Sequence, residues 1–303
     1  MVFVRCRRAL NRALARFDGR SSGDARRLDQ PPVFIVGAPR SGSTLLYQLL
    51  VEVLDVGYLS NRHCRLWGSP ALVERFVPPK RSSSHTYESI HGRTTGAGAP
   101  SECGEYWYRY FRRRPHHVSL AEADPARLRA LRASVRRFGA AAGRPLLFKN
   151  LYCTLRLEPI AAALPEAAFI LIRRDVVDNA HSILEARKRI HGDYAVWWST
   201  EPPEIERLRT LPAEQQAVEQ VRMVEAAAER TRAAGPERFL ELRYEDLCAN
   251  PRAAVDEIEA FLEGIGIPVS RRGIAPEKFK RRASNRIDSP LYERLVAYAR
   301  SVE

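Results

Sequence analysis

Glycine, arginine and hydroxyl residues gather in the eight residues 37–44, which read Gly-Ala-Pro-Arg-Ser-Gly-Ser-Thr. Gly37 and Gly42 allow the backbone to turn its N–H groups toward a common centre, where they can bind a phosphate or a similar anion. Arg40 adds a cation. The spacing is that of the nucleoside triphosphate loop GxxxxGK[ST], except that Ser43 replaces the lysine. The stretch therefore predicts a loop for an anion with a shorter charged chain than a triphosphate.

Two further apolar stretches end in basic residues. Leu-Leu-Phe precedes Lys149, and Phe-Ile-Leu-Ile precedes Arg173 and Arg174. Ligands of open parallel sheets gather at the carboxyl ends of the strands, which favours a site role for Lys149 over a solvated lysine. Strand alternation turns Arg173 to the opposite face from Arg174. Ser182 follows Arg174 by eight residues, about two helical turns, so both side chains can reach one phosphate.

Strands and helices must position these residues. Residues 33–36 form a buried apolar strand before the glycine loop, and the apolar residues after it recur at helical spacing: Leu45, Leu46, Leu49, Leu50 and Val53. We expect a parallel α/β sheet. Further helices are predicted over residues 124–142, 176–190, 213–234 and 251–262, the last one capped by Asn250. Residues 55–100 are rich in turn formers and predict a lid or a wall of the site, and residues 271–303 form a basic tail.

These segments resemble sulfotransferases that use 3′-phosphoadenosine 5′-phosphosulfate, especially the bacterial branch related to carbohydrate- and protein-tyrosine-directed enzymes. The loop PRSGST is similar to the family's PRSG[ST]T loop, and the resemblance covers roughly residues 31–300. It implies a three-layer α/β domain of the P-loop type, with a central parallel sheet flanked by helices. It also implies a nucleotide co-substrate, adenosine 3′,5′-bisphosphate as product, and no required metal ion.

The resemblance also implies roles for individual residues. The 5′-phosphosulfate would be held by the loop residues Arg40, Ser41, Gly42, Ser43 and Thr44. The 3′-phosphate would be bound by Arg174 and Ser182, and Tyr244 in the segment RYEDL would lie near the adenine. Lys149 would contact the bridging region of the phosphosulfate. In the basic tail, Arg282 and Ser284 are further candidates for the 3′-phosphate, with a solvated charge run as the alternative.

In-line sulfuryl transfer to a hydroxyl or amine requires donors at the bridging oxygen, which gains negative charge, and a general base for the acceptor proton. Arg40 and Lys149 are the predicted cationic donors. Protein-tyrosine sulfotransferases carry a glutamate shortly after the first helix, whereas residues 58–63 contain no carboxylate here. Glu102, which lies beside an aromatic cluster, is the first candidate for the base, followed by His63 and Glu105.

The composition restricts the domain organisation, the charge of the ligand and the location that we expect. The 303 residues are 45% hydrophobic and carry a net charge of +13, which predicts one domain over residues 31–303 with an anionic ligand, preceded by a basic segment over residues 1–30. Cys6, Cys64, Cys103, Cys153 and Cys248 show neither metal-ligand spacing nor a disulfide framework. The longest apolar run is too short to span a bilayer, which predicts a cytoplasmic protein.

The basic N-terminal segment predicts an amphipathic helix. Its narrow apolar face favours docking on the body of the protein over lying on a membrane or on nucleic acid, although peripheral membrane association stays open. Residues 21–23 read as a linker. No nucleic-acid-binding motif is present, and the expected acceptor is a small molecule such as a carbohydrate, a tyrosyl or phenolic group, or a lipid-linked polyol. The sequence does not determine the oligomeric state.

Two other functions fit parts of the sequence. A P-loop kinase or nucleotidase shares the strand, loop and helix, but requires a lysine at position 43 and an aspartate that binds magnesium. A non-catalytic protein that binds a bisphosphorylated nucleotide would keep the anion-binding residues without a working base. Sulfuryl transfer is favoured because the elements for the leaving group and for the 3′-phosphate are both present.

Overall fold

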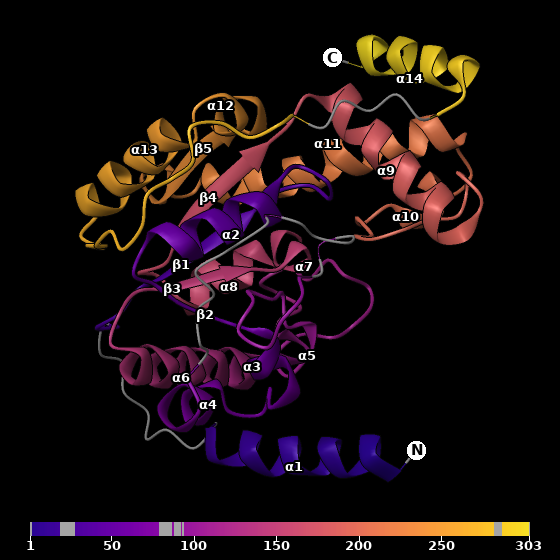
Figure 1. Ribbon diagram of the computed structural model, residues 1–303. Helices are drawn as coiled ribbons and strands as arrows, with labels where there is room; N and C mark the ends of the chain where they lie inside the picture. The colour runs from indigo at the N-terminus through magenta and orange to yellow at the C-terminus, as the bar shows by residue number, and fades with distance from the viewer. Residues whose placement is uncertain are drawn as a thin grey trace.

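Five parallel strands form the central sheet of the protein, seen in a computed structural model (Figure 1). The structure describes residues 2–18, 28–78, 87, 92, 94–281 and 287–302. The strands are β1 (Pro32–Val36), β2 (Gly57–Tyr58), β3 (Leu146–Lys149), β4 (Ala168–Arg173) and β5 (Phe239–Arg243). Their order is β2-β3-β1-β4-β5. Because β1 lies between β3 and β4, the loop after β1 leaves the sheet where the strand order reverses, the usual ligand position in such folds.

Helices cover both faces of this sheet, which confirms the predicted α/β architecture. The longer helices are α1 (Val2–Asp18), α2 (Ser43–Val53), α6 (Pro125–Ala142), α9 (Val176–His191), α11 (Ala213–Arg232), α13 (Pro251–Gly264) and α14 (Ser289–Ser301). The shorter ones are α3 (Asn61–Arg65), α4 (Pro70–Phe76), α5 (Gly104–Trp107), α7 (Leu151–Thr154), α8 (Leu157–Ala163), α10 (Ile205–Leu208) and α12 (Tyr244–Ala249), with a 3₁₀ turn at Pro236–Arg238.

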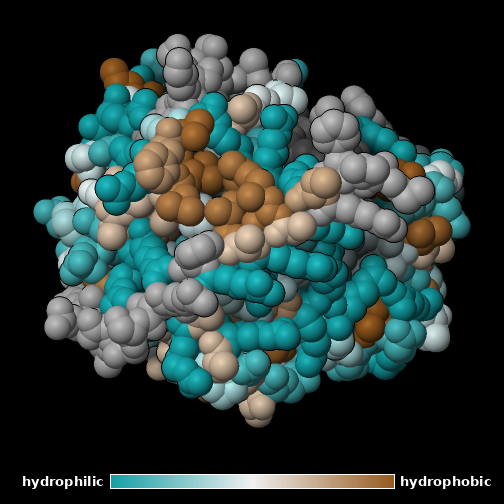
Figure 2. Space-filling view, turned by 90° about the horizontal axis from the view of Figure 1, so that it is seen from below, coloured by the Kyte–Doolittle hydropathy of each residue, from teal (hydrophilic) through white to brown (hydrophobic). Residues whose placement is uncertain are grey.

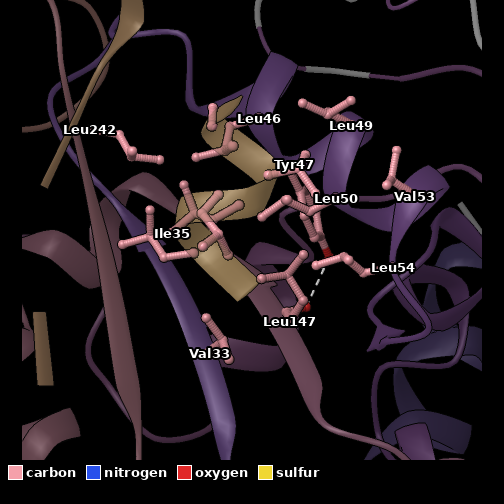
Figure 3. Close-up of a cluster of buried hydrophobic side chains, with 14 of the residues drawn as sticks. Val33, Ile35, Leu46, Tyr47, Leu49, Leu50, Val53, Leu54, Leu147 and Leu242 are labelled. Carbon is pink, nitrogen blue, oxygen red and sulfur yellow. Dashed lines mark hydrogen bonds between the residues drawn. The ribbon is translucent and has the colours of Figure 1, made fainter. Parts of the chain in front are cut away.

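The alternation of side chains along β1 builds two cores. Val33 and Ile35 pack with α2, α12 and α13, and Figure 3 shows them facing Leu46 and Leu50 of α2. Phe34 lies on the other face, among aromatic side chains of α5 and α6 and of the neighbouring strands. Each such buried side chain contributes about 1.5–3 kcal/mol relative to exposure. A third core joins α9, α11 and α14.

Several elements differ from the expectation. The segment predicted as a turn-rich wall contains β2, α3 and α4, which are too short to produce a periodic apolar pattern. The basic tail ends in α14, whose residues Leu291 and Leu295 are buried against α9 and α11. The tail candidates Arg282 and Ser284, the linker over residues 21–23 and much of the predicted wall lie outside the described residues.

The predicted N-terminal helix is present and docks on the body, as the narrow apolar face indicated. Asn11 of α1 donates from Nδ2 to the carbonyl of Arg65 at 3.0 Å, and its Oδ1 accepts from the amide of Gly68 at 2.8 Å. Asp18, at the end of α1, is buried and forms an ion pair with Arg109 at 3.0 Å. None of the described helices is long and apolar enough to cross a membrane.

Candidate active site

A cavity of about 2140 Å³ opens at the carboxyl ends of β1, β3 and β4. Single-ligand sites usually measure about 300–1,000 Å³, so this cavity has room for two substrates side by side. It is lined by most of the residues selected from the sequence: Arg40, Gly42, Ser43, Thr44, Glu102, Lys149, Arg174, Ser182 and Tyr244. The glycine loop and the distant Arg174–Ser182 pair therefore face one space.

The glycines of the loop are required by close packing. A Cβ at Gly37 would lie 2.4 Å from the carbonyl oxygen of Ile172, and one at Gly42 would lie 2.3 Å from Cδ2 of Tyr244. Gly42 also has a φ of 96°, in the left-handed region that favours glycine. Thr154 secures the start of the loop, because its Oγ1 accepts from the amide of Gly37 at 3.1 Å.

Helix α2 begins directly after the loop, and no side-chain cap is described at its N-terminus. Its first amides carry the partial positive charge of the helix and lack carbonyl partners within the helix. Ser43 and Thr44, the first two residues of α2, line the cavity, so this helix end is directed into it. Such an end binds sulfate or phosphate groups.

Arg40, Arg174 and Ser182 converge on one side of the cavity. Arg40 donates from Nε to Oγ of Ser182 at 3.0 Å, and Arg174 donates from Nη1 to the carbonyl of Arg40 at 3.3 Å. The guanidinium of Arg174 lies 4.8 Å from the centre of the Tyr244 ring. Arg173 points away, as strand alternation predicts, and pairs with Glu225 at 2.8 Å.

Asn179 is a contributor that the sequence did not reveal. It lies one helical turn before Ser182 on α9 and is fully buried. With its amide nitrogen directed at the loop, it donates to the carbonyl of Pro39 at 2.7 Å and to that of Arg40 at 3.2 Å. The loop is thus held by α9 as well as by Thr154. Asparagine at this position carries no recognisable sequence signal, because only the tertiary fold brings α9 against the loop.

Lys149, Thr44 and Glu102 form a second polar cluster. Lys149 is almost fully buried and donates from Nζ to Oγ1 of Thr44 at 3.1 Å. It also forms a short ion pair with Oε1 of Glu102. The side chain of Glu102 is 26% exposed. Its backbone carbonyl accepts from Nδ2 of Asn150 at 3.0 Å, which fixes the segment that carries the carboxylate. A cation and a carboxylate therefore stand beside the anion loop.

His63 is not part of this site, which corrects the prediction that it is a candidate base. Its side chain is fully buried, and it does not line the cavity. Nδ1 accepts from the amide of Ser60 at 3.1 Å, within the cap of α3, and Nε2 lies 3.6 Å from Glu74. Burial lowers the pKa of His63 to about 3, so the ring is neutral at physiological pH.

Two other predicted residues lie beside the cavity rather than in its lining. Glu105 is an exposed carboxylate that pairs with Arg113 at 2.6 Å. Ser41 is fully buried inside the loop, and its hydroxyl has no hydrogen-bond partner among the described residues. Glu105 therefore lacks the access to the cavity that a base requires.

Aromatic side chains from outside the glycine loop also line the cavity, together with charged residues such as Arg113, Arg114 and Glu201. Among the aromatic residues are Tyr108, Tyr152, Trp197 and Trp198. His116 joins them, a residue that sequence reasoning missed. It lies 4.3 Å from the Tyr152 ring and accepts at Nδ1 from the amide of Glu201 at 2.9 Å. Burial lowers the pKa of His116 to about 4. These aromatic side chains can hold a ring-shaped or apolar molecule beside the anion loop.

Residues 31–268 match the model of the sulfotransferase family. The chain belongs to this family. It is 28% identical over 261 residues to the omega-hydroxy-beta-dihydromenaquinone-9 sulfotransferase Stf3 of Mycobacterium bovis and, to the same extent, to that of Mycobacterium tuberculosis. The alignment covers 78% of this chain and 63% of these curated relatives. The resemblance seen in the sequence is confirmed.

The fold is shared with a solved sulfotransferase. The crystal structure of sulfotransferase STF9 from Mycobacterium avium aligns over 90% of this chain and 68% of the other, with a TM-score of 0.55 and 16% identity. This likeness confirms the predicted α/β fold of the sulfotransferases. Among the described residues, no group of three or more histidine, cysteine, aspartate or glutamate side chains is arranged to hold a metal ion.

Proposed function

We propose that the protein transfers a sulfuryl group from 3′-phosphoadenosine 5′-phosphosulfate to a hydroxyl or amine acceptor. The observation that supports the proposal best is the shared cavity of the glycine loop and the Arg174–Ser182 pair. A nucleotide with charged groups at both the 5′ and the 3′ position requires two anion-binding sites in one cavity of the protein. The loop and α2 supply one site, and Arg174 after β4 together with Ser182 in the second turn of α9 supplies the other.

The residues present fit this donor. The amides at the start of α2 and the guanidinium of Arg40 favour a singly charged sulfate and the adjoining phosphate. Ser43, in place of a lysine, leaves the loop with less positive charge than a triphosphate site. Tyr244 lines the cavity between Gly42 and Arg174, which supports a position for the adenosine beside its ring.

In the proposed reaction a new S–O or S–N bond forms to the acceptor while the sulfur bond to the bridging oxygen of the donor breaks. Lys149 and the loop amides stabilise the negative charge that develops on that oxygen. Glu102 accepts the proton of the acceptor, because it is the partly exposed carboxylate closest to Lys149. Thr44 orients Lys149 through its hydroxyl.

The aromatic side chains that line the cavity favour an acceptor with apolar or ring-shaped parts. Trp197, Trp198, Tyr108 and Tyr152 provide flat surfaces for a phenol, a sugar ring or a lipid alcohol. The curated relatives are named for an omega-hydroxy-dihydromenaquinone, which supports the lipid-linked hydroxyl among the acceptors expected from the sequence, beside the carbohydrate and the phenol. The proposal therefore includes all three as acceptor classes.

Thermal unfolding with adenosine 3′,5′-bisphosphate tests the donor site. A ligand at 100 times its Kd stabilises the native state by about 2.7 kcal/mol, so the midpoint should rise with bisphosphate concentration. Transfer of labelled sulfate in an acceptor screen then tests the reaction. Magnesium-dependent ATP hydrolysis would instead favour a P-loop kinase, and tight bisphosphate binding without transfer to any acceptor would favour a non-catalytic binder.

A further inference from the structure

An apolar surface remains uncovered on the side of the molecule formed by α1 and α4. Figure 1 places both helices at the lower end of the molecule, and Figure 2, which views that end, shows one continuous apolar area. The large apolar side chains that these two helices expose are Leu10 of α1 and Leu72, Phe76 and Val77 of α4 and its end. Phe76 is 71% exposed, which is unusual for a phenylalanine. Clustered side chains of this kind mark a binding surface.

The docking of α1 leaves this surface uncovered. Asn11 and Asp18 hold one side of α1 on the body, and Leu14 is half-buried beside them. Leu10 lies on the flank of that contact and is 49% exposed. Leu14 packs against Gly68 of the body, whereas Leu10 stays at the surface, so α1 buries only part of its apolar face among the described side chains.

The same two helices expose several arginines, and Arg75 lies over the ring of Phe76. Those of α1 and α4 that are exposed are Arg7, Arg8, Arg12, Arg16 and Arg75. Within the described stretches 6–16 and 70–77 no acidic side chain is exposed, because Glu74 is buried against Arg144. Arg8, Arg12 and Arg16 recur every four residues and form a stripe along the helix. Within these two described stretches the surface thus combines apolar side chains with positive charge and shows no exposed carboxylate.

We infer that α1 and α4 form a docking surface for an anionic lipid bilayer. Apolar side chains that enter the boundary between headgroups and acyl chains, flanked by arginines at the headgroup level, are the features of an interfacial helix. A purely electrostatic partner such as a nucleic acid would not require the exposed Phe76 and Leu72. A second copy of this chain would bring the arginine stripes of both copies together. The combination therefore fits lipid with negative headgroups.

The docking surface is also connected to the cavity. The carbonyl of Arg65, at the end of α3, accepts from Asn11, while Arg65 itself lines the cavity. A bilayer bound to α1 and α4 would thus lie next to one wall of the site. This inference does not depend on the reaction proposed above, since lipid binding is measured without any substrate.

Co-sedimentation of the full chain with vesicles tests the inference. We expect binding to phosphatidylcholine vesicles that contain about one third phosphatidylglycerol and much weaker binding to phosphatidylcholine alone, since arginines near an anionic surface are attracted to its headgroups. The double variant Leu72→Ser/Phe76→Ser should lower the affinity at least about tenfold because it removes the apolar anchors. Arg12→Glu should lower it about tenfold through charge.

Matched controls lie elsewhere on the surface. Ile274→Ser removes an apolar side chain that is 82% exposed outside α1 and α4. Arg300→Glu reverses an exposed charge on α14, which lies at the other end of the molecule from α1 (Figure 1). Both should bind vesicles like the unmodified chain, and all variants should keep its midpoint of thermal unfolding, which excludes misfolding.

Three results would overturn the inference. The unmodified chain could fail to bind the anionic vesicles, or the Leu72→Ser/Phe76→Ser variant could bind as well as the unmodified chain. Analytical ultracentrifugation could also show, without lipid, a dimer that this variant abolishes. That third result would assign the surface to a second copy of the chain.

Discussion

The two sides of the cavity are built differently. The side that we propose for the donor consists of a loop, strand ends, the first turn of α2 and the first two turns of α9, held by the sheet and by hydrogen bonds such as that of 3.0 Å between Arg40 and Ser182. The acceptor side consists of aromatic side chains from short helices and irregular segments, including Tyr108, Tyr152 and Trp198. The rigid side suits one unchanging nucleotide, whereas the irregular side can vary with the acceptor. Substitutions on the two sides should therefore change different kinetic constants.

Glu102→Gln is expected to have the largest effect, because Glu102 lies where the two sides meet. Loss of a general base lowers kcat by about 10²–10⁴-fold, whereas bisphosphate affinity should change little. Initial rates and bisphosphate titrations measure both quantities. Glu105→Gln is the control, since Glu105 is exposed and pairs with Arg113 outside the cavity lining. Unchanged turnover in Glu102→Gln would remove Glu102 from the mechanism.

Arg174→Ala tests the donor side. Hydrogen bonds to a charged group contribute about 1.5–3 kcal/mol, so bisphosphate affinity should fall by about ten- to a hundredfold, as measured by calorimetry. The neighbouring Arg173→Ala should leave that affinity unchanged and lower stability instead, because Arg173 pairs with Glu225 on the opposite face. Equal losses of affinity in both variants would contradict the assigned 3′-phosphate site.

Trp198→Ala tests the acceptor side. If an aromatic contact with the acceptor contributes about 0.5–1.5 kcal/mol, its loss should raise the KM for the acceptor by about two- to tenfold. Bisphosphate affinity should stay constant. Val196→Ala is the control, because Val196 is an exposed apolar residue nearby in the sequence and does not line the cavity. A change in bisphosphate affinity alone would show that Trp198 belongs to the donor side.

The smallest expected effect is on the free energy of unfolding, and it arises from His63, which does not line the cavity. Burial lowers the pKa of His63 to about 3, while the unfolded chain has a value near 6.5. Between these values the unfolded state binds more protons, so the free energy of unfolding should fall as pH decreases below about 6.5, by at most about 1.4 kcal/mol per pH unit. Urea unfolding of His63→Gln should show a shallower pH dependence. An unchanged slope would assign the effect to other groups.

The donor side was predictable from the sequence because its residues follow strands. Glycine spacing, strand alternation and helical spacing place Gly42, Arg174 and Ser182 by rules that act over a few residues. Their presence around one cavity agrees with the expectation, while their roles in binding stay proposals.

The site residues and short elements that the sequence did not reveal depend on contacts between segments that are distant along the chain. His63 and His116 are similar in sequence terms, yet the fold buries one in a helix cap and brings the other to the cavity. Asn179 reaches the loop only because β4 pairs with β1 and carries α9 to it. The wall segment has elements of a few residues, such as β2, whose pairing with β3 no local pattern reveals.

The contact between Gly42 and Tyr244 restricts how the protein can evolve. The tyrosine ring occupies the space where any side chain at position 42 would begin. Loss of the ring would remove this clash, but the φ of 96° at position 42 would still disfavour any side chain there. Position 42 is therefore expected to keep its glycine whatever residue occupies position 244, two thirds of the chain away, whereas position 244 can change only to residues that fill the space above that glycine.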